Sequence, residues 1–227
     1  MAESRFQRRR RRILNEVIQR GWAAVRSAGA IAPGTLAAER FATFGAGSII
    51  GFPTAVLYGE RQIHIGRDTL ICGWVTLAAG YGPHQTTVPP RALVIGDRCV
   101  IGIRSGIVAH QSIEIGDDVW FGQAVYVTDA NHGFEDPDVP IGRQLGPHQS
   151  VSIGEGSWIG HGVVILPGSR IGRHVVVAAG SVVRGEVPDH SVIAGVPAKV
   201  LRRRVDGRWV KGRADADTVL ATAGSAE

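Results

Sequence analysis

Aliphatic residues recur at every sixth position in the second half of this chain. The series is Ile153, Ile159, Ile165, Ile171, Val177 and Val183. The same spacing occurs upstream in the sets Ile65, Ile71 and Leu77, then Ile95, Ile101 and Ile107, then Ile115, Phe121 and Val127. A six-residue unit is too short to bury its own apolar side chain, so neighbouring units must stack to form a core. The spacing therefore predicts triangular coils of three short strands, in which successive coils pair as parallel strands about 4.8 Å apart.

Two further positions of the repeat support this prediction. If the aliphatic residue points inward, the fifth position also points inward, and it carries small or compact side chains such as Thr69, Val75 and Cys99. The second position is often glycine, and we expect a positive φ there because each turn is tight. These glycines are Gly66, Gly96, Gly102, Gly116, Gly122, Gly154, Gly160 and Gly172. No helical stretch of about ten residues lies between the strands, which argues against an α/β sheet.

Composition and charge bound the remaining possibilities. With 227 residues, 44% of them hydrophobic, the chain can form one domain with a sizeable core. It has neither a long uncharged apolar run nor a signal peptide, so we expect a cytoplasmic protein. Cys72 and Cys99 are expected to be free thiols, with Cys99 as a small buried residue.

The net charge of +5 is concentrated at the two ends of the chain. Residues 1–40 include the run Arg8 to Arg12, and we expect them to form a basic helical segment that caps the open first coil. Residues 202–227 are expected to form a basic and then polar tail. The arginine run could also contact an anionic membrane, which we favour less, and no pattern accompanies it that predicts nucleic-acid binding.

The repeat is interrupted by two large loops, at about residues 80–92 and 133–150. A solenoid accepts insertions only at its corners, and binding sites are commonly built from such loops. The first loop carries Tyr81 and His84, and the second carries Arg143 and His148. His132 stands directly before the second loop, and His110 closes the preceding coil.

Three segments carry a resemblance to a known family. They are Asn131-His132 before the loop Pro140-Ile141-Gly142-Arg143-Gln144, the run Val177-Ala178-Ala179-Gly180-Ser181, and the closing motif Ala194-Gly195-Val196-Pro197-Ala198-Lys199-Val200. Together with the repeats, they resemble the hexapeptide-repeat acyltransferases that modify sugars, over residues 44–201. The resemblance implies an all-β fold, a left-handed parallel β-helix after an N-terminal helical segment. It also implies a homotrimer that transfers an acyl group from acyl-coenzyme A to a carbohydrate hydroxyl.

The resemblance also implies a set of site residues. His132 would act as the general base that accepts the hydroxyl proton, because imidazole titrates near neutral pH. Asp129 and Asn131 would support it, and Asp129, Glu135 or a backbone carbonyl could fix its tautomer. The residues expected to contact the acceptor are Tyr81, His84, His110 and Arg143, and His110 is also a rival base. Acyl-coenzyme A is expected to contact the backbone groups around Ala179, Gly180 and Ser181. The other residues expected to contact it are Trp158, His161, Arg184, Lys199 and Arg202. The acyl chain could be acetyl or longer, up to octanoyl, and we expect no metal and no permanently bound cofactor.

Two other functions are compatible with a solenoid. One is a zinc lyase like the γ-type carbonic anhydrases, whose fold is similar, but His161 and His174 are thirteen residues apart and lack the close histidine spacing of those enzymes. The other is a non-enzymatic scaffold, against which the two loops and the closing motif argue.

Overall fold

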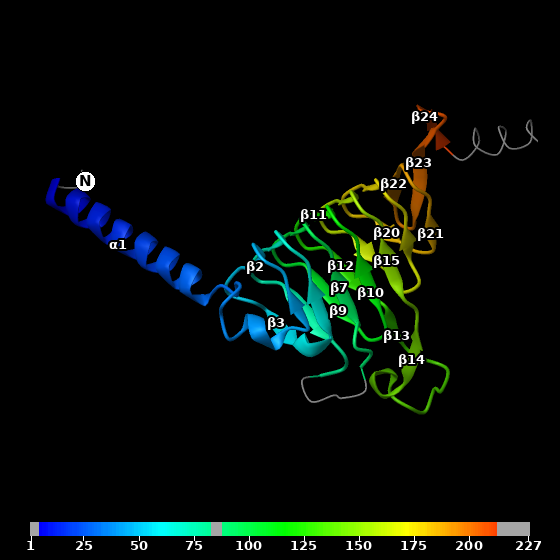
Figure 1. The fold of residues 1–227 in the computed structure, drawn as a ribbon, viewed down its shortest axis with the longest axis horizontal. Coiled ribbons are helices and arrows are strands. Elements are labelled where there is room, and N and C mark those ends of the chain that lie inside the picture. Colours follow the sequence, from blue (N-terminus) through cyan, green and yellow to red (C-terminus); the bar gives the residue numbers. More distant parts are fainter. Residues whose placement is uncertain (1–4, 83–87, 213–227) are drawn as a thin grey trace, which may run out of the picture.

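The computed structural model describes residues 5–82 and 88–212, which form a β-helix preceded by one long helix (Figure 1). Each full coil contributes one short strand to each of three parallel sheets, named here sheets I, II and III in the order in which the chain enters them. Their strands lie side by side along the coil axis (Figure 1). The predicted stack of parallel strands is therefore confirmed.

The bounds of the strands are as follows. Sheet I contains β1 (Thr43–Phe44), β4 (Ile63–Ile65), β7 (Leu93–Ile95), β10 (Ile113–Ile115), β15 (Val151–Ile153), β18 (Arg170–Ile171) and β21 (Glu186–Val187). Sheet II contains β2 (Ile49–Ile50), β5 (Leu70–Ile71), β8 (Val100–Ile101), β11 (Trp120–Phe121), β16 (Trp158–Ile159), β19 (Val176–Val177), β22 (Ser191–Gly195), β23 (Ala198–Val205) and β24 (Arg208–Lys211). Sheet III contains β3 (Val56–Tyr58), β6 (Thr76–Ala79), β9 (Gly106–Ala109), β12 (Tyr126–Thr128), β17 (Val164–Ile165) and β20 (Val182–Val183). The short antiparallel pair β13 (Ala130–His132) and β14 (Leu145–His148) forms a separate hairpin.

The interior of the prism is filled by the residues that the repeat places inward. Ile101, Ile107 and Ile159 from the first position are fully buried, and so are Val75 and Cys99 from the fifth. Burial raises the pKa of the Cys99 thiol to about 11, so this cysteine is un-ionised at neutral pH, as a small buried residue should be. The predicted core is confirmed.

The expected reason for the glycines at the second position was wrong. Gly122 and Gly160 do not have positive φ; the left-handed residues lie two positions further on, for example at Asp118 and Gly162. A Cβ on Gly122 would lie 2.7 Å from the backbone nitrogen of His161 in the next coil, and one on Gly160 would be equally close to the coil that follows. The glycines are therefore needed because the backbones of successive coils approach closely at these corners.

The outward rows of the sheets differ in character. Paired outward residues in sheet II are mostly apolar and run in the order Ile49, Leu70, Val100, Trp120, Trp158, Val176 and Val192. The corresponding row of sheet I is largely polar and runs Thr43, His64, Val94, Glu114, Ser152, Arg170 and Glu186. The prism therefore has chemically distinct faces.

The N-terminal helix does not cap the first coil. Helix α1 (Arg5–Gly29) has no buried residue and extends away from the coils (Figure 1). The cap is instead the following segment, in which Ile31 pairs with Ile50, and Ala38, in the 3₁₀ helix η1 (Ala38–Arg40), is buried with Phe41. The apolar side chains of this segment therefore cover the open end of the prism.

The C-terminal end of the solenoid is longer than the sequence predicts. Strand β23 pairs antiparallel with β22, and β24 pairs antiparallel with β23 through Lys211. The expected tail at residues 202–227 therefore begins as a hairpin, and residues 213–227 lie outside the described part. The remaining short helices are η2 (Glu60–Gln62), whose buried Glu60 pairs with Arg40, and η3 (Ile141–Arg143) in the second loop. None of the described helices combines the length and apolar character needed to cross a membrane.

Candidate active site

The two large loops leave the prism at one corner, where the chain passes from sheet III to sheet I. The first loop joins β6 to β7, and the second joins β12 to β15 through the β13–β14 hairpin. Between them, β9 and β10 are joined by a tight turn that contains His110. Because β6, β9 and β12 are neighbours in sheet III, the three connections lie next to one another along this corner.

Asp129 organises the corner from inside. Its side chain is fully buried, and Oδ1 accepts a hydrogen bond from the His110 amide at 2.8 Å, while Oδ2 accepts from the amides of Gln111 and Ser112 at 2.8 and 2.7 Å. The Asp129 carbonyl accepts from the Gln149 amide at 2.7 Å. Asp129 therefore ties the base of the second loop to the preceding coil.

The electrostatic state of Asp129 follows from these contacts. Burial by itself raises the pKa of the carboxyl group, but the His110 side chain and the amides of Gln111, His110 and Ser112 outweigh it and hold the pKa below its usual value. Asp129 is therefore ionised at neutral pH. The sequence suggested that it might orient His132, but its hydrogen bonds reach residues 110–112, so the carboxylate positions His110 instead.

Three aromatic side chains gather beside Asp129. The Tyr81 ring lies 4.3 Å from the His110 ring, the His148 ring is stacked on His110 at 5.5 Å, and the Tyr81 hydroxyl is hydrogen-bonded to Nε2 of His148. Burial, followed by the Asp129 charge, raises the pKa of Tyr81. The structure therefore joins one residue from each loop to the histidine of the turn between them.

His110 is held in a defined orientation within this group. Its side chain is 11% exposed, and Nδ1 is buried 3.5 Å from Oδ1 of Asp129, a separation too long for a good hydrogen bond. A proton on Nδ1 is favoured by the neighbouring carboxylate, which leaves Nε2 as the nitrogen able to accept a proton or a hydrogen bond.

His132 lies on the exposed edge of the same corner. It ends β13, where its backbone pairs with Leu145, and Ala130 on the same strand pairs with His148. Within the described residues its side chain makes no hydrogen bond, and both His132 and Asn131 are exposed. Two residues of strand span about 7 Å, so His132 is close to the Tyr81, His110 and His148 group without belonging to it.

A clamp within the second loop was not predicted from the sequence. The Gln144 side chain donates from Nε2 to the carbonyls of Asp136 and Val139, at 2.8 and 2.7 Å, and its Oε1 accepts from the Asp136 amide at 3.1 Å. The sequence signal for this clamp is Gln144 at the end of segment 140–144, because a glutamine side chain can donate to backbone carbonyls and accept from backbone amides. Arg143 is exposed in the same loop and is not joined to Tyr81 or His110 by the described contacts, while the predicted contact His84 lies outside the described residues.

The residues predicted to bind the acyl donor divide into groups. Trp158 is 58% exposed in the outward row of sheet II. The same row continues from Val192 to Arg202 and then to Lys211, and Lys199 is exposed on the same strand as Arg202. Trp158 and Arg202 are three strand spacings apart, about 14 Å. An apolar row that ends in cations suits an extended molecule with a phosphate at one end.

Other predicted donor contacts lie elsewhere. His161, Ala179 and Gly180 are on turns between sheets II and III, where the His161 carbonyl accepts from the Gly180 amide at 2.8 Å. Arg184 is exposed on the turn that follows β20, at the corner of the two loops, and not on the Trp158 face.

Ser181 adjoins the turn of Ala179 and Gly180. Its side chain is buried, as the repeat predicts: the hydroxyl donates to the Ala178 carbonyl at 2.7 Å, and the Ser181 carbonyl accepts from the Val164 amide. The Ser181 side chain therefore belongs to the coil interior, and a contact of its backbone with the donor stays a prediction.

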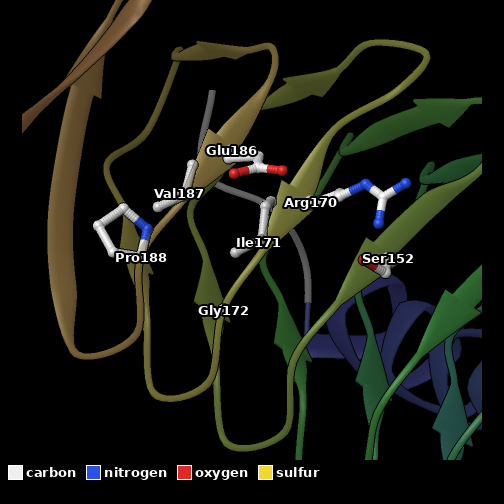
Figure 2. Close-up of a pocket in the computed structure, with 7 residues that line it drawn as sticks. All are labelled: Ser152, Arg170, Ile171, Gly172, Glu186, Val187 and Pro188. Carbon is white, nitrogen blue, oxygen red and sulfur yellow. The ribbon is translucent and has the colours of Figure 1, made fainter.

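A shallow hollow on sheet I contains none of the predicted site residues. It is lined by Ser152, Arg170, Ile171, Gly172, Glu186, Val187 and Pro188 (Figure 2). Arg170 and Glu186 are paired across β18 and β21, so the hollow is a groove over the polar row of sheet I. It offers no pair of nucleophile and base and is not the candidate site.

No group of three or more His, Cys, Asp or Glu side chains is arranged to hold a metal ion in residues 5–82 and 88–212. The histidines at the candidate corner are positioned by an aspartate and a tyrosine, which is the pattern expected for proton transfer.

Comparisons with known protein families and sequences identify relatives of this chain. The family described as "Bacterial transferase hexapeptide (six repeats)" matches residues 150–185, and "Hexapeptide repeat of succinyl-transferase" matches residues 92–129. The putative lipopolysaccharide biosynthesis O-acetyl transferase WbbJ of Escherichia coli is 40% identical over 162 residues, covering 68% of this chain and 78% of that protein. The probable acetyltransferase Rv3034c of Mycobacterium tuberculosis is 37% identical over 151 residues, covering 63% of this chain and 45% of that protein.

Solved structures show the same architecture. AntD, an N-acyltransferase from Bacillus cereus whose structure contains dTDP and 3-hydroxybutyryl-CoA, aligns with a TM-score of 0.63 at 21% identity, over 87% of this chain and 99% of that one. This likeness concerns the fold alone. The chain belongs to the hexapeptide-repeat sugar O-acetyltransferase family, and it is an acyltransferase. The zinc-lyase and scaffold alternatives are therefore set aside.

Proposed function

We propose that this enzyme transfers an acetyl or longer acyl group from acyl-coenzyme A to a hydroxyl of a sugar, with His132 as the general base. The observation that carries the proposal is the convergence of both loops on one corner, where Asp129 fixes His110, and Tyr81 and His148 pack against it. His132 stands at the rim of that corner on the hairpin whose base Asp129 holds.

The chemistry requires little more than proton transfer and positioning. A thioester carbonyl is already activated, whereas a sugar hydroxyl is a weak nucleophile until a base removes its proton. An imidazole can accept that proton near neutral pH, which is typically worth about 10²- to 10⁴-fold in rate. Tyr81, His110 and His148 offer donors and acceptors to the other hydroxyls of the sugar and would hold the reacting one against His132.

The acyl donor is proposed to lie along the outward row of sheet II. Trp158 would pack against its apolar arm, and Arg202 and Lys199 would meet its phosphates. His161, Ala179 and Gly180 border the same row at the next corner. Coenzyme A is a co-substrate in this proposal, and no permanently bound group is required.

The positions of donor and base favour a homotrimer. In a triangular coil, the corner between sheets III and I lies opposite sheet II. A donor lying on sheet II therefore cannot reach the histidine corner of its own chain. A neighbouring copy that presents its corner to the Trp158 row would complete the site, and Arg184 could then meet the donor from that neighbouring corner. We also propose left-handed coiling and a cytoplasmic location, as the family resemblance and the sequence suggest.

The proposal is tested by measuring thiol release from acetyl- to octanoyl-coenzyme A against a panel of sugars. Wild type is compared with His132→Ala, His110→Ala and the control His174→Asn, which changes a histidine on a distant turn. We expect His132→Ala to lower turnover at least about a hundredfold. His110→Ala should mainly raise the KM for the sugar, and the control should match wild type.

Two outcomes would contradict the assignment. Full activity of His132→Ala, together with loss of turnover in His110→Ala, would make His110 the base. An absence of sugar-dependent thiol release with every donor would refute carbohydrate as the acceptor class.

A further inference from the structure

Helix α1 presents a large apolar face that nothing in the described chain covers. Seven large apolar side chains on it are between 48% and 77% exposed: Phe6, Ile13, Leu14, Val17, Ile18, Trp22 and Val25. At 3.6 residues per turn they occupy about half of the helix circumference. Exposed apolar surface of this extent marks an interaction site.

The same helix is strongly basic. It contains eight arginines and one glutamate, and Glu16 is paired with Arg20 at 2.7 Å. Arg9 and Arg10 line a shallow groove together with Phe6, Ile13 and Val17, so guanidinium groups and apolar side chains border the same surface. A partner must therefore offer negative charge and apolar surface side by side.

We infer that α1 lies on an anionic phospholipid surface, with its apolar face among the acyl chains and its arginines at the phosphates. Arg10 lies within the apolar face, and its long side chain extends outward so that the guanidinium group reaches the phosphates. Amphipathic helices with this composition bind at the membrane interface, parallel to its plane. Each arginine near such a surface contributes about fivefold in affinity, corresponding to about 1 kcal/mol. The inference is independent of the function proposed above.

Other occupants fit the helix less well. The coils of the same chain do not receive it, since no residue of α1 is buried. A parallel bundle of α1 helices from several copies would bring their arginine runs together, and Arg10 would lie in the middle of the apolar seam. Nucleic acid would satisfy the arginines and leave the apolar face exposed.

The test uses the full-length protein and vesicles of phosphatidylcholine with and without phosphatidylglycerol, separated by sedimentation. Val17→Glu places a charge within the apolar face, and Gln19→Glu places the same charge on the polar face as a matched control. We expect wild type to bind only the anionic vesicles. Val17→Glu should weaken binding at least about tenfold, and Gln19→Glu should weaken it by no more than about fivefold. The melting temperature of both variants should equal that of wild type, because neither site contacts the coils.

Trp22 supplies a second readout, because it lies at the border of the apolar face. Lipids brominated on their acyl chains should quench its fluorescence, and the additional quenching should disappear in Trp22→Phe. Equal loss of binding in the two glutamate variants, or no quenching that depends on Trp22, would overturn the inference. So would binding to a DNA duplex without binding to vesicles, or an oligomer that Val17→Glu dissociates in a protein that ignores vesicles.

Discussion

Replacing Asp129 by asparagine should destabilise the fold and loosen the active corner. Asparagine keeps one carbonyl oxygen for the His110 amide, but its NH₂ group would face the amides of Gln111 and Ser112, which now bond to Oδ2. Hydrogen bonds to a charged group contribute about 1.5 to 3 kcal/mol each, so the loss of two predicts about 3 to 6 kcal/mol. For a domain of this size, that corresponds to a melting temperature lower by about 6 to 24 °C.

The assay is thermal unfolding followed by circular dichroism at one protein concentration, with Asp138→Asn as the control. Asp138 lies in the same hairpin loop and is exposed, so its loss should change the melting temperature by less than about 2 °C. The pH dependence gives an independent check. The pKa of Asp129 is lower in the folded protein, so its stabilising contribution is complete above the unfolded pKa and disappears as pH falls through the folded value.

The difference between wild type and Asp129→Asn should therefore be constant near neutral pH and shrink in acid, below about pH 4. A drop in melting temperature no larger than that of the control would refute the argument. A difference that widened in acid would show that the carboxylate is not favoured in the folded state.

Three further predictions follow from the described contacts. Trp158→Ala should raise the KM for acyl-coenzyme A by about tenfold, as expected for an exposed aromatic surface that packs on a ligand, with a smaller effect on the KM for the sugar; equal changes in both would place Trp158 outside the donor site. Gly122→Ala should lower the stability by about 1 to 3 kcal/mol in urea unfolding, because its Cβ would press on the backbone of His161; unchanged stability would show that the coils can separate there without cost. Cys72 should react with a thiol reagent in the native protein at pH 8 whereas Cys99 should not, because burial raises the pKa of Cys99 to about 11; rapid modification of both would show that the coils open.

The sequence predicts the core of this molecule well because the position of a residue within the six-residue repeat determines whether its side chain points inward. A repeat that places Ile101 inside must also place the fifth residue of the same unit, Ser105, inside, and both are buried. The expected reason for Gly122 was wrong because the spacing alone does not say whether a glycine serves its own φ or a neighbouring backbone. The two explanations are distinguished only by the distance from a Cβ built on the glycine to the backbone of the next coil.

The site could be predicted only in part. The loops, Tyr81 and His110 were recognised because they interrupt the repeat, but the role of Asp129 depends on which coil lies beside it, and that is a contact between residues almost twenty positions apart. The position of the Ser181 side chain follows from the repeat alone, which assigns it to the interior, where it is buried.

The ends of the stack of coils also affect whether one molecule can add to another end to end. A rod of parallel strands exposes unpaired backbone groups at each end, and such edges could add further rods indefinitely and produce a fibre. Here Ile31 pairs with Ile50 at one end, and the antiparallel hairpin of β23 and β24 follows β22 at the other. Because an antiparallel strand does not continue the parallel register, sheet II ends in antiparallel pairing at both ends, which disfavours end-to-end addition of further coils through that sheet.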